Sequence, residues 1–206
     1  MGKGFFIFGS TESELILSKV IVDWAKKRSE RMNFETRDLA IIGILGGISI
    51  MLSFTPLGFI PVPTAAGSAT IMHIPVIIGA IIEGPIAGAI IGLIFGLASF
   101  IRGAAFFSDP LVAILPRILI GITAAYSYLW TKDMITKMGS VIFAAIIGTV
   151  TNTIGVLSLA LWIGYIPNVE TFWGIALTHG APEIIVGALI IVAVVKALKR
   201  ADVSGL

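Results

Sequence analysis

The chain has 206 residues, of which 57% are apolar and only 13% are charged. A soluble domain carries about 25% charged residues, so this composition excludes an ordinary water-soluble fold and indicates an all-α integral membrane protein. The absence of cysteine excludes disulfides and thiolate metal sites, and we expect no metal centre. The net charge of +2 suits an anionic lipid bilayer better than nucleic acid, so no nucleic-acid partner is expected.

Residues 1–36 are predicted to form a cytoplasmic amphipathic extension. Thr11 and Glu14 fit a capping box, after which apolar residues recur at helical spacing beside lysines and arginines. Such a helix would lie along the inner leaflet of the membrane. Met32 is an equally good start of the natural chain, so this extension is given no function.

Six apolar segments follow and predict a bundle of six transmembrane helices. They span residues 39–54, 71–82, 86–101, 110–130, 141–164 and 172–197. The second and third are divided at Gly84-Pro85, because Gly-Pro is a plausible helix break and 71–101 is too long for one span. The second is only about 18 Å long, whereas a membrane needs roughly 20 residues. We therefore expect it to be tilted, shielded by protein or partly re-entrant.

The basic residues predict the orientation of this bundle. With six spans, all but two of the 14 lysines and arginines fall on one side of the membrane. Only Arg102 and Arg117 remain for the other side. Cytoplasmic segments retain basic residues, so both termini are expected to be cytoplasmic. The predicted domains are the extension 1–36, a six-helix membrane domain 37–200 and a cytoplasmic tail 201–206.

Small residues spaced by four mark the first and third spans. The third carries Gly84, Gly88, Gly92 and Gly96, and the first carries Gly43 and Gly47 beside Ala40. Such stripes let helix backbones approach closely. We expect packing inside the bundle for the third span and docking of a partner membrane protein for the first, although both roles are open to each.

Ionisable and amide side chains inside the spans predict a site in the outer half of the bundle. A charge in the hydrocarbon region costs about 2.5–3.5 kcal/mol, so it normally faces a cavity or a partner. Arg117 lies about 10 Å below the outer end of its span. The candidate ligand-binding residues converge at similar depth, and they are His73, Arg117, Asn152, His179 and Glu183.

Structural roles compete with binding for each of these residues. Arg117 and Glu183 would neutralise each other if they were paired, and Asn152 would suit a hydrogen bond between helices. The two histidines, His73 and His179, would be satisfied interfacial residues at span ends.

Motifs for ATP binding and hydrolysis are absent from the sequence. There is no G-x-x-x-x-G-K-[ST] phosphate loop, no H-E-x-x-H and no G-x-S-x-G. A self-powered pump is therefore poorly supported, no catalytic residue is assigned, and we expect no cofactor in this chain.

Several segments together resemble a known family. They are residues 69–79 with Met72-His73-Ile74-Pro75, residues 83–92 with Gly84-Pro85, Asp109-Pro110 leading to Pro116-Arg117, and residues 179–183 with His179, Pro182 and Glu183. Over about residues 37–200 the chain resembles the substrate-binding S components of energy-coupling factor (ECF) vitamin transporters.

The resemblance implies a six-helix bundle with cytoplasmic termini in a prokaryotic cell membrane. It implies a vitamin site near the outer face, covered by the first long loop, here the charge-free segment 55–70. It also implies docking on a membrane coupling subunit (EcfT-like) joined to two ABC ATPases, which use the ATP. Family members often dock through Ala-x-x-x-Ala in the first helix; here Ile44 follows Ala40 by four residues, and Gly43 and Gly47 supply a substitute.

Among the vitamins, pantothenate is the substrate that we expect, partly on the resemblance of the His-Ile-Pro and His-Gly-x-Pro-Glu segments. A ligand carboxylate would suit Arg117, and hydroxyl or amide groups would suit Asn152, His179 and Glu183. His73 would lie beneath the loop prolines. Riboflavin, pyridoxine-type compounds and a cobalamin precursor stay open, and an uncharged vitamin is favoured if Glu183 neutralises Arg117.

Two other classes of function compete with the transporter hypothesis. An intramembrane lipid-modifying enzyme would use Glu183 and His179 as acid and base. A structural membrane subunit would use the polar cluster only to hold its helices together.

Overall fold

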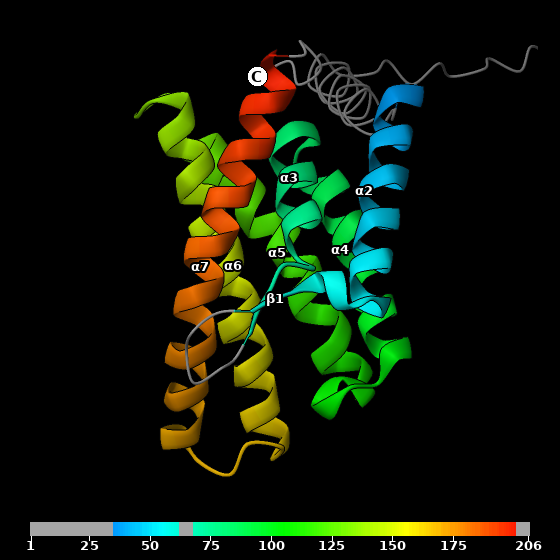
Figure 1. Cartoon of the computed structure of the whole chain (residues 1–206), viewed down its shortest axis with the longest axis vertical. Helices are drawn as coiled ribbons and strands as arrows, with labels where there is room; N and C mark the ends of the chain where they lie inside the picture. The colour runs from blue at the N-terminus through cyan, green and yellow to red at the C-terminus, as the bar shows by residue number, and fades with distance from the viewer. Residues whose placement is uncertain (1–34, 62–67, 201–206) are drawn as a thin grey trace, which may run out of the picture. The chain divides into compact units, whose positions relative to one another are not determined.

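The computed structural model describes residues 35–61 and 68–200 (Figure 1). Residues 1–39 and 40–206 divide into two units, and the account below concerns the second. The helices are α2 (Thr36–Phe54), α3 (Ile74–Glu83), α4 (Pro85–Arg102), α5 (Pro110–Thr131), α6 (Lys137–Ile163) and α7 (Val169–Arg200). Short 3-10 turns cover Pro56–Gly58 and Ala105–Ser108. The predicted extension, apart from residues 35 and 36, and the predicted tail 201–206 lie outside the described residues.

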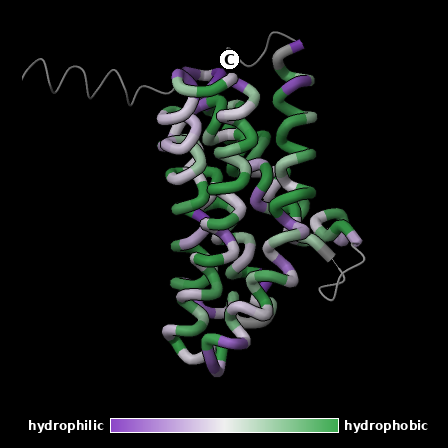
Figure 2. The backbone as a smooth tube through the Cα atoms, turned by 90° about the vertical axis from the view of Figure 1, so that its left-hand side faces the viewer, coloured by the Kyte–Doolittle hydropathy of each residue, from purple (hydrophilic) through white to green (hydrophobic). Residues whose placement is uncertain are grey.

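Five helices in the described part of the chain are long and apolar enough to cross a membrane, and α3 is a shorter apolar helix. Hydrophobic residues make up most of the length of these helices (Figure 2). Many large apolar side chains are exposed, among them Ile44, Leu177 and Leu189. In a membrane protein such side chains face lipid. The predicted membrane helices are therefore present, while the count of six crossings and the cytoplasmic termini stay predictions.

A two-stranded hairpin interrupts the all-helical pattern. Strand β1 (Phe59–Pro61) pairs antiparallel with β2 (Ser68–Thr70), with Phe59 opposite Thr70. The predicted second span, 71–82, is wrong at its start, because α3 begins only at Ile74. Residues 68–70 pair with β1, and Pro75 suits the first turn of a helix.

Helix α3 is short and is surrounded by protein rather than exposed on the outside of the bundle. Its ten residues span about 15 Å, and all residues from Ile74 to Ile81 are buried. It packs against α4, α5, α6 and α7. Shielding by protein, one of the three expected arrangements, is the one that the structure has.

Three of the four glycines in the predicted stripe on α4 pack against other helices. A Cβ atom at Gly92 would collide with the Arg117 carbonyl of α5, and one at Gly96 would lie 2.9 Å from an α5 Cα atom. Gly88 faces Gly121 of α5 and Ala80 of α3. Gly84 is not part of this contact: its φ of 88° makes the bend between α3 and α4, and a Cβ there would meet nothing within 4 Å. The close approach of α4 to α5 places Arg117 beside Phe95 of α4, a contact described below.

Candidate substrate-binding cavity

A cavity of about 250 Å³ lies among α4, α5, α6, α7 and the hairpin. Most of its wall area is apolar, as in small-molecule sites, although half of the lining residues have polar or charged side chains. The lining residues are Phe59, Thr70, Met72, Phe95, Ser99, Arg102, Ala104, Phe107, Arg117, Asn152, Thr153, Val156, Leu157, Ile175, His179 and Glu183. Four of the five predicted ligand-binding residues thus line this cavity, and His73 does not. Their role in binding stays a prediction.

Arg117 is held in place by a carbonyl that a proline sets free. Pro116 lies inside α5 and has no N–H to donate to the carbonyl four residues earlier, that of Val112. The Arg117 Nη1 donates to this same Val112 carbonyl at 3.0 Å. The adjacent proline and arginine therefore act together: one exposes an acceptor and the other uses it.

Two aromatic rings hold the rest of the Arg117 guanidinium. Its central carbon lies 4.4 Å from the Phe107 ring centroid and 5.4 Å from that of Phe95, which are cation–π distances. The side chain is only 3% exposed. Its Nε is buried and has no hydrogen-bond partner among the described residues. The positive charge of Arg117 therefore has no carboxylate partner among the described contacts.

Three successive polar residues of α6 lie in different surroundings. Thr151 hydrogen-bonds to Thr123 of α5 at 2.9 Å, and Thr153 donates to Glu183 of α7 at 3.4 Å. Asn152, between them, lines the cavity and is 9% exposed. Within the described part of the chain, its Oδ1 is buried without a partner. The interhelical hydrogen bonds considered for Asn152 are made by its neighbours instead.

The Glu183 carboxylate is bound by threonines. Its Oε1 accepts from the Thr70 backbone N–H at 3.1 Å and from the Thr70 hydroxyl, and its Oε2 accepts from Thr153. Arg117 donates elsewhere, so pairing between Arg117 and Glu183 is not among the contacts of residues 35–61 and 68–200. The two charges lie on the same cavity wall and have different partners.

The two histidines differ in position. His179 of α7 is partly buried and lines the cavity. His73 caps α3, is 1% exposed, and its Nε2 lies 3.1 Å from the Thr149 hydroxyl of α6. His73 thus bonds to α6 and is not among the residues that line the cavity.

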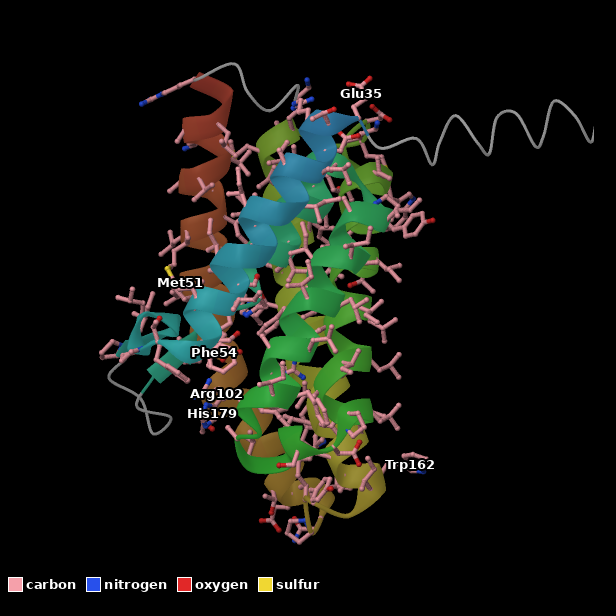
Figure 3. All side chains as sticks on the ribbon, turned by 90° about the vertical axis from the view of Figure 1, so that its right-hand side faces the viewer. Glu35, Met51, Phe54, Arg102, Trp162 and His179 are labelled. Carbon is pink, nitrogen blue, oxygen red and sulfur yellow. The ribbon has the colours of Figure 1, made fainter. Side chains whose placement is uncertain are left out.

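Arg102 is a cavity residue that the sequence analysis did not select. It ends α4, and its guanidinium lies 4.9 Å from the Phe59 ring centroid of β1 and 3.8 Å from the Met72 sulfur. Figure 3 shows Arg102 and His179 at a similar level of the bundle. A signal was present in the charge pattern: Arg102 and Arg117 are the two basic residues assigned to the outer side, and both line the cavity.

The predicted docking residues on α2 face open space. Gly43 and Gly47 are exposed, and a Cβ at either would meet nothing within 4 Å, whereas one at Gly46 would press on Ile94 of α4. Ala40 is exposed as well. One face of α2 thus packs on the bundle, while the face with the predicted docking residues is uncovered; docking itself stays a prediction.

The described residues contain no group of three or more His, Asp or Glu side chains placed to hold a metal ion. Apart from hydroxyl groups, the polar side chains that line the cavity provide two guanidinium groups, one carboxylate, one amide and one imidazole.

Comparisons with known proteins agree with this arrangement. A family model described as ECF transporter, substrate-specific component, matches residues 37–198. The chain is 31% identical over 189 residues to the pantothenic acid transporter PanT of Lactococcus lactis subsp. cremoris, covering 80% of this chain and 94% of the relative. It is 29% identical over 203 residues to the pantothenate transporter PanT of Leuconostoc mesenteroides subsp. mesenteroides, covering 84% and 99%.

The match spans nearly all of the described membrane domain, and its relatives are bacterial. With five helices able to cross a bilayer in the described part, the protein is a multi-pass plasma membrane protein of prokaryotes. The lipid-modifying enzyme considered above is thereby set aside. The chain belongs to the family of substrate-specific components of ECF transporters, and it is a transporter component rather than an enzyme.

Proposed function

We propose that the chain captures pantothenate from the outer side of the membrane and delivers it through an ECF-type importer. The names of the two relatives support the choice of vitamin. The observation that carries the proposal is that two residues lining one cavity, Arg117 and Asn152, each have a buried polar atom without a partner among the described residues: the Nε donor of Arg117 and the Oδ1 acceptor of Asn152. A ligand that satisfies both must offer an acceptor, best an anion, and a separate donor.

Pantothenate offers these groups on one flexible molecule. Its carboxylate would accept from Arg117 and Arg102, and its amide N–H or hydroxyl groups would donate to Asn152 or bond to His179. Its branched methyl groups suit the apolar wall formed by residues such as Val156 and Leu157. A cavity of about 250 Å³ has less room for a three-ring flavin or a corrinoid precursor.

Calorimetric titration of the purified, detergent-solubilised chain tests the vitamin. Pantothenate is compared with its alcohol analogue, in which a hydroxymethyl group replaces the carboxylate, and with riboflavin and pyridoxine. We expect tight binding of pantothenate and about 10- to 100-fold weaker binding of the alcohol, the worth of a hydrogen bond to a charged group. Arg117→Gln should reduce this preference, because it removes the cation that recognises the carboxylate.

Equal affinity of the wild-type chain for acid and alcohol would refute carboxylate recognition by Arg117. Tight binding of riboflavin or pyridoxine with no binding of pantothenate would replace the proposed vitamin. Mass spectrometry of small molecules that co-purify with the chain is an independent check of either result.

Transport is proposed to need a membrane coupling subunit and two ABC ATPases, which supply the energy from ATP. The uncovered small-residue face of α2 supports α2 as the docking helix, since small residues allow close helix approach. The test is uptake of labelled pantothenate by cells that express the chain with or without these partners. Uptake at the same rate without them would refute the importer assignment.

A further inference from the structure

The Glu183 carboxylate links helix α7 to the hairpin. Both of its oxygens accept hydrogen bonds from protein groups: the Thr70 N–H at 3.1 Å and the Thr70 hydroxyl on one, and Thr153 at 3.4 Å on the other. The side chain is 5% exposed. A buried carboxylate is tolerated when it accepts several hydrogen bonds, and here two of them come from one residue of β2.

The hairpin depends on such external contacts because it is very short. Three residue pairs join β1 to β2 in the described part of the chain, and an isolated two-stranded hairpin is at best marginally stable in water. Phe59, the strand partner of Thr70, lies under the Arg102 guanidinium at 4.9 Å. Phe59 and Thr70, an end pair of the hairpin and both lining the cavity, are thus each held by a charged side chain from a different helix.

The contact does not engage the unsatisfied groups of the cavity. Arg117 Nε and Asn152 Oδ1 are without partners among the described residues, whereas the Glu183 oxygens are occupied. If Glu183 also contacted a ligand whose carboxylate bound to Arg117, the two negative charges would repel each other. The division of partners favours a role for Glu183 in the wall itself.

We propose that Glu183 is a positioning residue: it fixes β2 against α7 through Thr70 and thereby slows the departure of the bound substrate, without binding the substrate. The part of this inference that concerns substrate departure rests on the proposed function. The part that concerns β2 holds for the ligand-free protein and is tested separately.

Amide hydrogen exchange of the ligand-free, full-length chain in detergent tests the attachment of β2. In Glu183→Ala the Thr70 amide loses its acceptor, so exchange in peptides covering residues 68–71 should become about 10- to 100-fold faster. Glu183→Gln retains an amide oxygen for the Thr70 N–H and should restore much of the protection. Glu170→Gln, an exposed glutamate on the same helix, is the matched control and should leave the exchange unchanged.

Stopped-flow dissociation of pantothenate tests the consequence for the ligand. Glu183→Ala should raise the dissociation rate about 10- to 100-fold, with Glu183→Gln in between. Thr70→Val, which removes the hydroxyl and keeps the backbone N–H, should raise it less. The double variant with Glu183→Ala should be no faster than Glu183→Ala alone, because both changes break the same contact.

Faster ligand dissociation with unchanged exchange at residues 68–71 would overturn the proposal, since Glu183 would then contact the ligand directly. Additive effects of Thr70→Val and Glu183→Ala would overturn it as well. If the wild-type chain binds no pantothenate, the proposed function fails, and the exchange experiment still decides whether Glu183 holds β2. Thr70→Val removes one hydroxyl, so it keeps the test decisive if Glu183→Ala does not fold.

Discussion

Replacing Pro116 by alanine should weaken substrate binding without a large loss of stability. The substitution restores an N–H group at position 116, which can donate to the Val112 carbonyl as in a regular helix. That carbonyl now accepts from Arg117 Nη1 at 3.0 Å. The new backbone donor competes for the acceptor, so the guanidinium loses the contact that fixes its direction.

The opposing contributions to stability nearly cancel. Pro116 is fully buried and packs beside Gly155 of α6, so loss of two ring carbons costs about 1–2 kcal/mol. A regular backbone hydrogen bond returns about 0.5–1.5 kcal/mol. The lost hydrogen bond from the charged Arg117 costs a further amount of about 1.5–3 kcal/mol, and removal of a proline from the helix interior returns about 3 kcal/mol. Without this contact Arg117 is less preorganised, which predicts about 10- to 100-fold weaker binding.

Thermal unfolding and calorimetric titration of Pro116→Ala in the same detergent measure the two effects. Pro110→Ala is the matched control. Pro110 occupies the first turn of the same helix, where the N–H that alanine introduces would have no partner within the helix. Unchanged affinity of Pro116→Ala for pantothenate would refute the idea that the freed carbonyl positions Arg117. A large fall in melting temperature would show that the packing of the ring outweighs the restored hydrogen bond.

Three further predictions concern packing, docking and the cavity. Gly121→Ala should lower stability by about 1–3 kcal/mol in thermal unfolding, because its Cβ would collide with the Gly88 backbone; Gly43→Ala, in open space, is the control. Gly43→Leu should leave pantothenate binding intact and stop uptake in cells that contain the coupling subunit and ATPases, and normal uptake would contradict docking at this face. Asn152→Ala should lower affinity about tenfold with little loss of stability in paired titration and unfolding experiments, whereas His73→Gln should do the reverse.

Local signals account for the helix boundaries that the sequence predicted well. The fourth span was placed at 110–130, and α5 runs from Pro110 to Thr131. Asp109 accepts hydrogen bonds from the Leu111 and Val112 N–H groups, so the start of the helix is encoded within a few residues. The start of α3 was missed because the pairing of Thr70 with Phe59 joins residues on the two sides of the loop, which no local pattern reports.

The sequence predicted how deep the site residues lie along their helices. It did not predict which way each side chain points or which residue it contacts. Counting along the spans placed Arg117, Asn152 and Glu183 at similar depth, and all three line the cavity. The same counting placed His73 among them, although its ring bonds to α6 away from the cavity wall. Arg102 was treated only as a marker of orientation, because its contact with the Phe59 ring depends on where the hairpin lies.

The contacts of Arg117 explain how the protein interior tolerates its positive charge. A buried arginine costs about 2.5–3.5 kcal/mol on insertion scales. One carbonyl and two aromatic rings offset part of this cost, since they stabilise the cation without neutralising it. The Nε stays unpartnered among the described residues, and the only carboxylate on the cavity wall is engaged by Thr70 and Thr153. If Glu183 bonded to Arg117 instead, an uncharged ligand would be expected. Because Thr70 and Thr153 donate to Glu183, its contacts agree with the anionic ligand proposed above.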